Sequence, residues 1–164
     1  MRSLPPPFRL LLAGALSLLP PAVLAAPAVE LSFSDFFVQP IGPRGLEPTA
    51  KLKAAEGREV RLVGYMVLRE QPQAGRFLLT PRPVAMAEHA DGEADDLPAS
   101  TVTVLLPESQ RARFVTHQGG PLALTGRLEF GPAEDDTGRV SWIRLHLAPE
   151  ALAANASAAA PHSH

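Results

Sequence analysis

The stretch Gly57–Arg69, G-R-E-V-R-L-V-G-Y-M-V-L-R, is the longest run of strand-favouring residues downstream of the N-terminal leader. Its apolar residues alternate at Val60 and Leu62 and then change phase at Gly64. A glycine inside a strand pattern is typical of a bulge or a sharp bend. We therefore expect Gly64 to lie at a bend with no room for a side chain. Such a bend would let one strand serve two sides of a small barrel.

Residues 26–56 are expected to form an approach segment in front of this strand. A short helix is predicted at 49–56, and Gly57 is expected to end it, because a glycine after the last turn favours helix termination. Residues 30–37, E-L-S-F-S-D-F-F, predict a short strand or one helical turn. We expect the three phenylalanines of this segment to pack across the barrel as a lid. If their side chains were exposed, they would favour aggregation. A binding patch is the alternative interpretation.

Four more strands are predicted downstream, at 76–81, 101–106, 122–130 and 139–147. A helix is expected between the third and fourth strands, beginning at Pro107 and running through E-S-Q-R-A-R-F-V. Five strands with one helix in this position are the order of an oligonucleotide/oligosaccharide-binding (OB) fold. We therefore predict a mainly-β domain at 57–148, a small five-stranded OB-like barrel. A β-sandwich is the rival architecture, but it usually has about seven strands.

The fourth predicted strand has the cleanest alternation in the chain. Leu124, Gly126 and Leu128 fall on one face, and Ala123 and Arg127 fall on the other. The pattern predicts that the two leucines are buried in the barrel and that Ala123 and Arg127 point outward.

Residues 1–25 have the pattern of a signal peptide. Arg2 and Arg9 accompany an apolar run at 10–19, and small residues near Ala25 suit cleavage. The run is shorter than the roughly 20 residues that a membrane span needs. We expect a periplasmic or secreted mature protein without a transmembrane segment; an uncleaved anchor is the alternative. Residues 149–164 are rich in alanine and poor in core-forming side chains, and we expect a disordered tail.

Composition narrows the chemistry. The chain contains no cysteine, so disulfides, lipoprotein anchoring and thiolate metal sites are excluded. It has 15 Lys and Arg against 17 Asp and Glu, and loss of the leader would make it more acidic. We expect no nucleic-acid partner, because nucleic acid is attracted by a basic face.

The loop at 82–100 is the one stretch with a density of metal-ligand residues. Oxygen-rich loops suit hard cations such as calcium, and an added histidine widens the choice to zinc or manganese. The candidate ligands for a divalent metal are His89, Asp91, Glu93, Asp95 and Asp96. The alternative is a solvated acidic loop that protects a sheet edge from aggregation.

Two motifs resemble a group of uncharacterised exported bacterial domains. Their core reads roughly L-x-G-K-x-V-x-I-x-G-Y, followed by an F-L-L-x-P strand; this chain has A-E-G-R-E-V-R-L-V-G-Y and F-L-L-T-P, with P-L-A-L-T-G-R-L further on. The resemblance covers about residues 31–147 and rests on structural glycines and apolar positions. In those relatives a cysteine and a histidine follow the F-L-L-x-P strand, whereas this chain has Met86 and His89 there. The resemblance implies a place beside envelope transporters, where some members of the group occur.

The sequence shows no G-x-S-x-G, H-E-x-x-H, phosphate-binding loop or Rossmann glycine pattern. We expect an exported, non-enzymatic binding or accessory module without a cofactor, which acts through contacts with a protein partner in the cell envelope. One alternative is a periplasmic protein that handles divalent metals through the His89 loop and the histidine-containing tail. The other is an enzyme of unknown mechanism.

Overall fold

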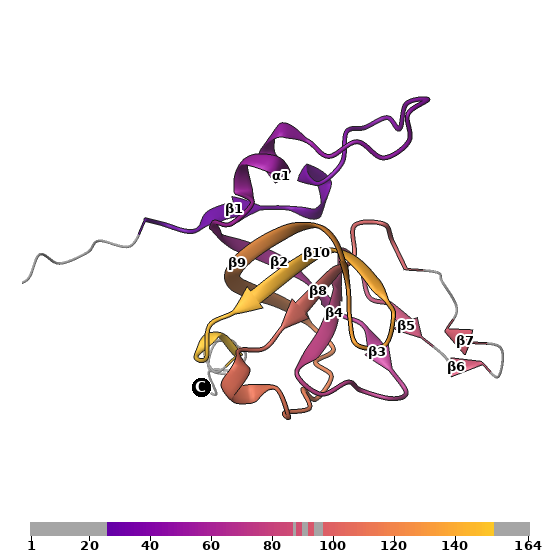
Figure 1. Cartoon of the computed structure of the whole chain (residues 1–164), viewed down its shortest axis with the longest axis vertical. Helices are drawn as coiled ribbons and strands as arrows, with labels where there is room; N and C mark the ends of the chain where they lie inside the picture. The colour runs from indigo at the N-terminus through magenta and orange to yellow at the C-terminus, as the bar shows by residue number, and fades with distance from the viewer. Residues whose placement is uncertain (1–25, 87, 90–91, 94–96, 153–164) are drawn as a thin grey trace, which may run out of the picture.

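The computed structural model describes residues 26–86, 88–89, 92–93 and 97–152 (Figure 1). Its largest unit is a six-stranded sheet. The strands are β1 (Val29–Leu31), β2 (Glu59–Met66), β4 (Arg76–Thr80), β8 (Val102–Leu105), β9 (Pro121–Glu134) and β10 (Val140–Leu147). Two small sheets pair β3 (Leu68–Arg69) with β5 (Ala85–Met86), and β6 (Glu88–His89) with β7 (Gly92–Glu93). The helical elements are α1 (Ala50–Ala55) and the 3₁₀ turns η1 (Phe33–Asp35) and η2 (Glu108–Gln110).

The order of the strands is that of an OB-like domain. The large sheet runs β1-β2-β4-β8-β10-β9, and β9 also pairs with β2. β8 and β10 are parallel, whereas the other pairs among β2, β4, β8, β9 and β10 are antiparallel. Only Tyr65 and Met66 of β2 pair with β4, and β1 occupies the edge of β2 at 60–62. The prediction of a mainly-β fold is confirmed, but the sheet has six strands where five were expected, because β1 adds to the edge of β2. The curved sheet is the partly open form of the OB arrangement and not a closed barrel.

The predicted change of phase in the first strand is wrong. Val60, Leu62, Gly64 and Met66 are all buried, and Val63 between them is exposed. β2 pairs with β9 in continuous register through Gly64, and Gly64 has no positive φ. The alternation of an ordinary strand therefore continues, with glycine in one of the inward positions.

Close packing explains why that position is a glycine. A Cβ atom at Gly64 would lie 2.7 Å from Cε2 of Phe33 and 2.9 Å from Cγ of Leu79. The expected lack of room is present, and its cause is a phenylalanine ring from the approach segment. Gly126 is similarly crowded, because a Cβ there would lie 2.5 Å from the carbonyl oxygen of His146. Gly57 differs: it has a φ of 72° just after α1, where glycine ends a helix without strain.

The predicted parity of the fourth strand is correct. Leu124 and Leu128 in β9 are fully buried, Ala123 is partly exposed and Arg127 is exposed. In the neighbouring strand β10, Ile143 and Leu145 are fully buried and pack in the same core. These two strands therefore form the apolar interior expected from the alternation.

The predicted helix after Pro107 is reduced to the three residues of η2, and Pro107 precedes its first residue. Beyond η2 the backbone is used in pairing with the segment before β4. The amide of Gly75 donates to the carbonyl of Arg113 at 2.8 Å, and Ala74 forms a bridge with Phe114. These tertiary bonds compete with the i to i+4 bonds that a longer helix needs, and they outweigh the local propensity.

The approach segment shares the core of the barrel. Phe36 is fully buried, and Phe33 and Phe37 are partly buried against the same cluster. Leu52 and Ala55 of α1 are buried there too. The lid interpretation of the phenylalanines is therefore correct, and Figure 1 shows this segment lying across one end of the strands.

The disordered tail was predicted to begin at residue 149, which is too early. Leu152 is buried within the main core, because the chain turns back after β10. Residues 153–164 and the leader at 1–25 lie outside the described residues. Within the described ranges, no helix is long and apolar enough to span a membrane.

Candidate binding groove

A groove of about 860 Å³ lies on the outer face of the sheet. One wall is the β9–β10 hairpin at 133–141, and the other consists of residues 73–75 and 106–111. The floor comes from three adjacent strands and contains Arg76, Leu78, Thr103, Leu105, Arg144 and His146.

Strand register places the floor residues in two rows. Arg76, Leu105 and His146 are cross-strand partners in one row. Leu78, Thr103 and Arg144 make up the second row. Because side chains alternate between the two faces of a strand, the core residues of β8 and β10 point inward while these rows point outward.

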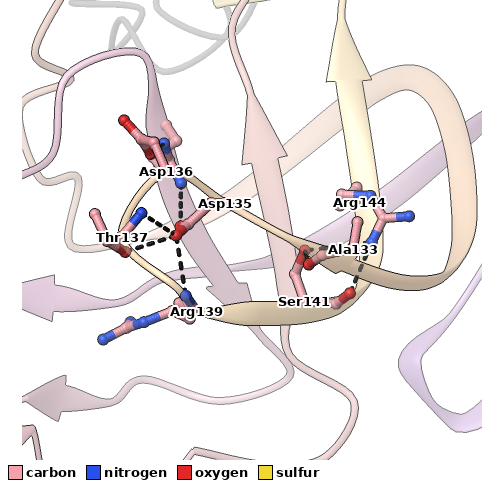
Figure 2. A network of polar contacts seen from close by, with 8 residues as sticks. Ala133, Asp135, Asp136, Thr137, Arg139, Ser141 and Arg144 are labelled. Carbon is pink, nitrogen blue, oxygen red and sulfur yellow. Dashed lines mark hydrogen bonds and ion pairs between the residues drawn. The ribbon is translucent and has the colours of Figure 1, made fainter.

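Arg144 is the most deeply buried cation of the groove, with only 7% of its side chain exposed. Its Nη1 donates to the carbonyl oxygens of Ser141 at 2.7 Å and Gly131 at 2.8 Å. Figure 2 shows the guanidinium beside Ser141 at the base of the hairpin. Its Nε is buried without a hydrogen-bond partner among the described residues. Arg144 thus holds the two arms of the hairpin over the sheet.

Glu129 completes this cluster. Its carboxylate lies 3.0 Å from Nη2 of Arg144 and 2.6 Å from Nε2 of His146. The hydrogen bond from Arg144, followed by that from His146, lowers the pKa of Glu129 from 4.5 to about 2. Glu129 is therefore ionised at neutral pH and balances the charge of the buried arginine.

Asp135 organises the hairpin turn. Its Oδ1 accepts hydrogen bonds from the amides of Thr137 at 2.9 Å and Arg139 at 3.1 Å, as Figure 2 shows. Burial raises the pKa of Asp135, but hydrogen bonds from Thr137 and Arg139 outweigh it and leave the pKa below its ordinary value. Gly138 has a φ of 82°, which suits the reversal of the chain.

An ion-pair clasp ties this turn to the floor of the groove. The guanidinium of Arg76 in β4 contacts the carboxylates of Asp135 and Asp136. Arg139 lies on the same wall, and burial followed by the nearby charges of Arg69 and Arg76 lowers its pKa. The clasp therefore lies where several guanidinium groups come close together.

A second, smaller hollow of about 280 Å³ lies between the end of β2, residues 83–85 and residues 117–119. Nε2 of His117 lies 3.2 Å from the carbonyl oxygen of Met66 there. His117 thus joins a loop to the end of β2.

The structure describes too few of the candidate ligands to test the predicted metal site, which therefore stays a prediction. His89 and Glu93 lie on the paired strands β6 and β7, whose backbone register joins Glu88 to Glu93 and His89 to Gly92. Asp91, Asp95 and Asp96 lie outside the described residues. Across the described part of the chain, no three His, Asp or Glu residues are grouped so that they could hold a metal ion.

Sequence reasoning missed the groove residues. His146 is half-buried and paired with Glu129. One signal was present: Arg144 and His146 interrupt the apolar run I-R-L-H-L of β10. A second was the turn sequence E-D-D-T-G-R, whose first aspartate has the spacing of a side-chain-stabilised turn.

Comparison with known proteins gives little further detail. No protein-family model matches the chain, and no curated protein matches it. Among solved structures, the chain is similar to a DUF3299 family protein from Pseudomonas aeruginosa PAO1, with 16% sequence identity and a TM-score of 0.43. That similarity covers 74% of this chain and 93% of the other.

Proposed function

We propose that this protein is an exported, non-enzymatic binding module that receives part of a protein partner in the cell envelope, beside an envelope transport system. The observation that carries the proposal is the open groove across β4, β8 and β10. OB folds bind their ligands on this face, between the loop after the first barrel strand and the loop between the last two. Here those loops are residues 67–75 and the β9–β10 turn, and both border the groove.

The charge pattern supports a polypeptide ligand. Leu105 is partly exposed and offers aliphatic contact on the floor, where Arg76 and Arg144 also lie. The walls carry four acids, Glu108, Glu134, Asp135 and Asp136, and two arginines, Arg111 and Arg139. A polypeptide can match apolar, basic and acidic positions together, whereas the phosphates of a nucleic acid match only the basic ones.

Site-specific photo-crosslinking tests this proposal. A benzoylphenylalanine at Ala133, on the hairpin wall, should form an adduct with one envelope protein in intact cells. The same group at Arg127, exposed on β9 outside the groove, is the matched control. Mass spectrometry identifies the adduct and also reports whether the chain begins near Ala26 after cleavage. Equal adducts from both positions, or none from Ala133, would contradict the proposal.

A further inference from the structure

We infer that the clasp end of the groove binds a carboxylate of an acidic polypeptide segment, which takes the place of Asp136 on Arg76. This inference rests on the proposed function and adds the chemical class of the ligand. The inference rests on three observations. These are the groove, the different exposure of the two aspartates that pair with Arg76, and the arginines near Arg76.

The two aspartates of the clasp are held very differently. Asp135 is 20% exposed, and its Oδ1 is committed to the turn through Thr137 and Arg139. Asp136 is 80% exposed and lies 2.8 Å from Nη2 of Arg76. An exposed ion pair of this kind adds little stability, so a ligand carboxylate can displace it at small cost.

The surroundings favour an anion at this position. The side chain of Arg76 is 23% exposed, so solvent and ligand can reach it. Arg139 shares the groove wall, and its pKa is lowered first by burial and then by the nearby charges of Arg69 and Arg76. A carboxylate bound at Arg76 would therefore lie close to more than one guanidinium group, which favours an anion there.

Arginine geometry and the groove floor then select the ligand. Asp135 holds Nη1 of Arg76, whereas Nη2 donates to Asp136 at 2.8 Å, so Nη2 is the donor that a ligand carboxylate would take over. Leu105, the cross-strand partner of Arg76, is partly exposed on the floor. A segment that alternates acidic and aliphatic side chains fits this surface, because one group meets Arg76 while its neighbour meets Leu105.

Calorimetry on the mature protein at low ionic strength tests the inference. The probe is a short, end-capped peptide of alternating leucine and glutamate, and the matched control has glutamine in place of glutamate. Arg76→Gln should weaken binding of the glutamate peptide by about tenfold or more, because a charged hydrogen-bonding partner is lost. Asp136→Asn should tighten it by about two- to fivefold, because the internal competitor is removed. Arg127→Gln, outside the groove, should leave it unchanged.

The gain of affinity in Asp136→Asn keeps the test decisive if Arg76→Gln folds poorly. Binding of the glutamine peptide as strongly as the glutamate peptide would overturn the inference. Equally strong binding of inorganic phosphate, or stronger binding of oligothymidylate, would overturn the assignment to an acidic polypeptide. If no peptide binds but crosslinking from Ala133 succeeds, the ligand class is wrong and the proposed function stands. If the peptide binds through Arg76 but no crosslinked adduct forms from Ala133, the inferred carboxylate site is supported and the proposal of an envelope protein partner is contradicted.

Discussion

At Gly64, tertiary packing leaves no room for a side chain, so the position requires glycine. Alanine at this position would force the ring of Phe33 and the side chain of Leu79 to move, since both lie within 3.0 Å of the new Cβ. We expect Gly64→Ala to lower the free energy of unfolding by about 1–3 kcal/mol, as overpacked cores do. Urea denaturation measures this. The matched control is Gly119→Ala, where a Cβ meets open space, and the prediction fails if both variants unfold at the same urea concentration.

Glu129 predicts a pH dependence of stability. Its folded pKa of about 2 lies below the ordinary value of 4.5, so the folded state holds the ionised form more strongly than the unfolded state does. The resulting stabilisation is fully present above about pH 4.5 and is lost as the pH falls toward about 2. Because the Glu129 side chain is 40% exposed, solvent screens the pair and reduces the size of the effect.

The variant Glu129→Gln isolates this contribution. We expect it to be less stable than the parent protein at pH about 7, and the difference should shrink at pH about 2.5, where the parent carboxylate is partly protonated. Urea midpoints at the two pH values give the comparison. Glu70→Gln, on an exposed loop, should show no such convergence. A constant gap between Glu129→Gln and the parent would mean that the carboxylate charge is not what stabilises this cluster.

At the scale of the element, β9 has one face in the core and one in solvent. Leu124→Ala removes a fully buried side chain and should lower the free energy of unfolding by about 2–5 kcal/mol. Arg127→Ala, on the exposed face of the same strand, should cost less than about 1 kcal/mol. Thermal melts of the two variants test the parity, and equal shifts would mean that the strand is rotated relative to the structure.

The β9–β10 hairpin should depend on Asp135 far more than on Asp136. Asp135→Ala removes the acceptor for Thr137 and Arg139 as well as the pair with Arg76, and should cost about 1–3 kcal/mol. Asp136→Ala removes an exposed partner and should cost less than about 1 kcal/mol. Hydrogen exchange of the amides at 133–141 should accelerate in Asp135→Ala alone. Equal acceleration in both variants would show that the turn depends on the clasp and not on its internal bonds.

The elements that the sequence predicts well are those whose pattern is local. The alternation of Leu124 and Leu128 identified a half-buried strand, and Gly57 identified the end of a helix. The helix after Pro107 was overpredicted, because the hydrogen bond between Gly75 and Arg113 joins segments far apart in the chain. Gly64 was assigned a bend for the same reason, since Phe33 occupies its space from another segment.

At the scale of the whole molecule, the groove depends on contacts that no local pattern contains. Asp135 lies 59 residues from Arg76, and Arg144 and Glu129 meet through the register of two strands. In the sequence, each of these groove residues gives only a weak signal, such as an arginine inside an apolar strand or an aspartate before a turn. Only the arrangement of the strands brings them to one face, so the candidate site follows from the fold and could not be predicted before it.

The approach segment should likewise prove to be part of the domain. Phe36 is fully buried in the core that the barrel strands share, although it lies outside the predicted barrel at 57–148. Phe36→Ala should lower the free energy of unfolding by about 3–5 kcal/mol, because it leaves a cavity between this segment and the strands. Ile41→Ala is the matched control: Ile41 is 57% exposed in the loop between η1 and α1, and its truncation should change stability by less than about 0.5 kcal/mol. Single cooperative unfolding transitions, followed by circular dichroism and by the fluorescence of Trp142 in β10, should shift together in Phe36→Ala. A Trp142 transition that stays at the parent midpoint while only part of the circular dichroism signal is lost would show that residues 26–56 fold independently of the barrel.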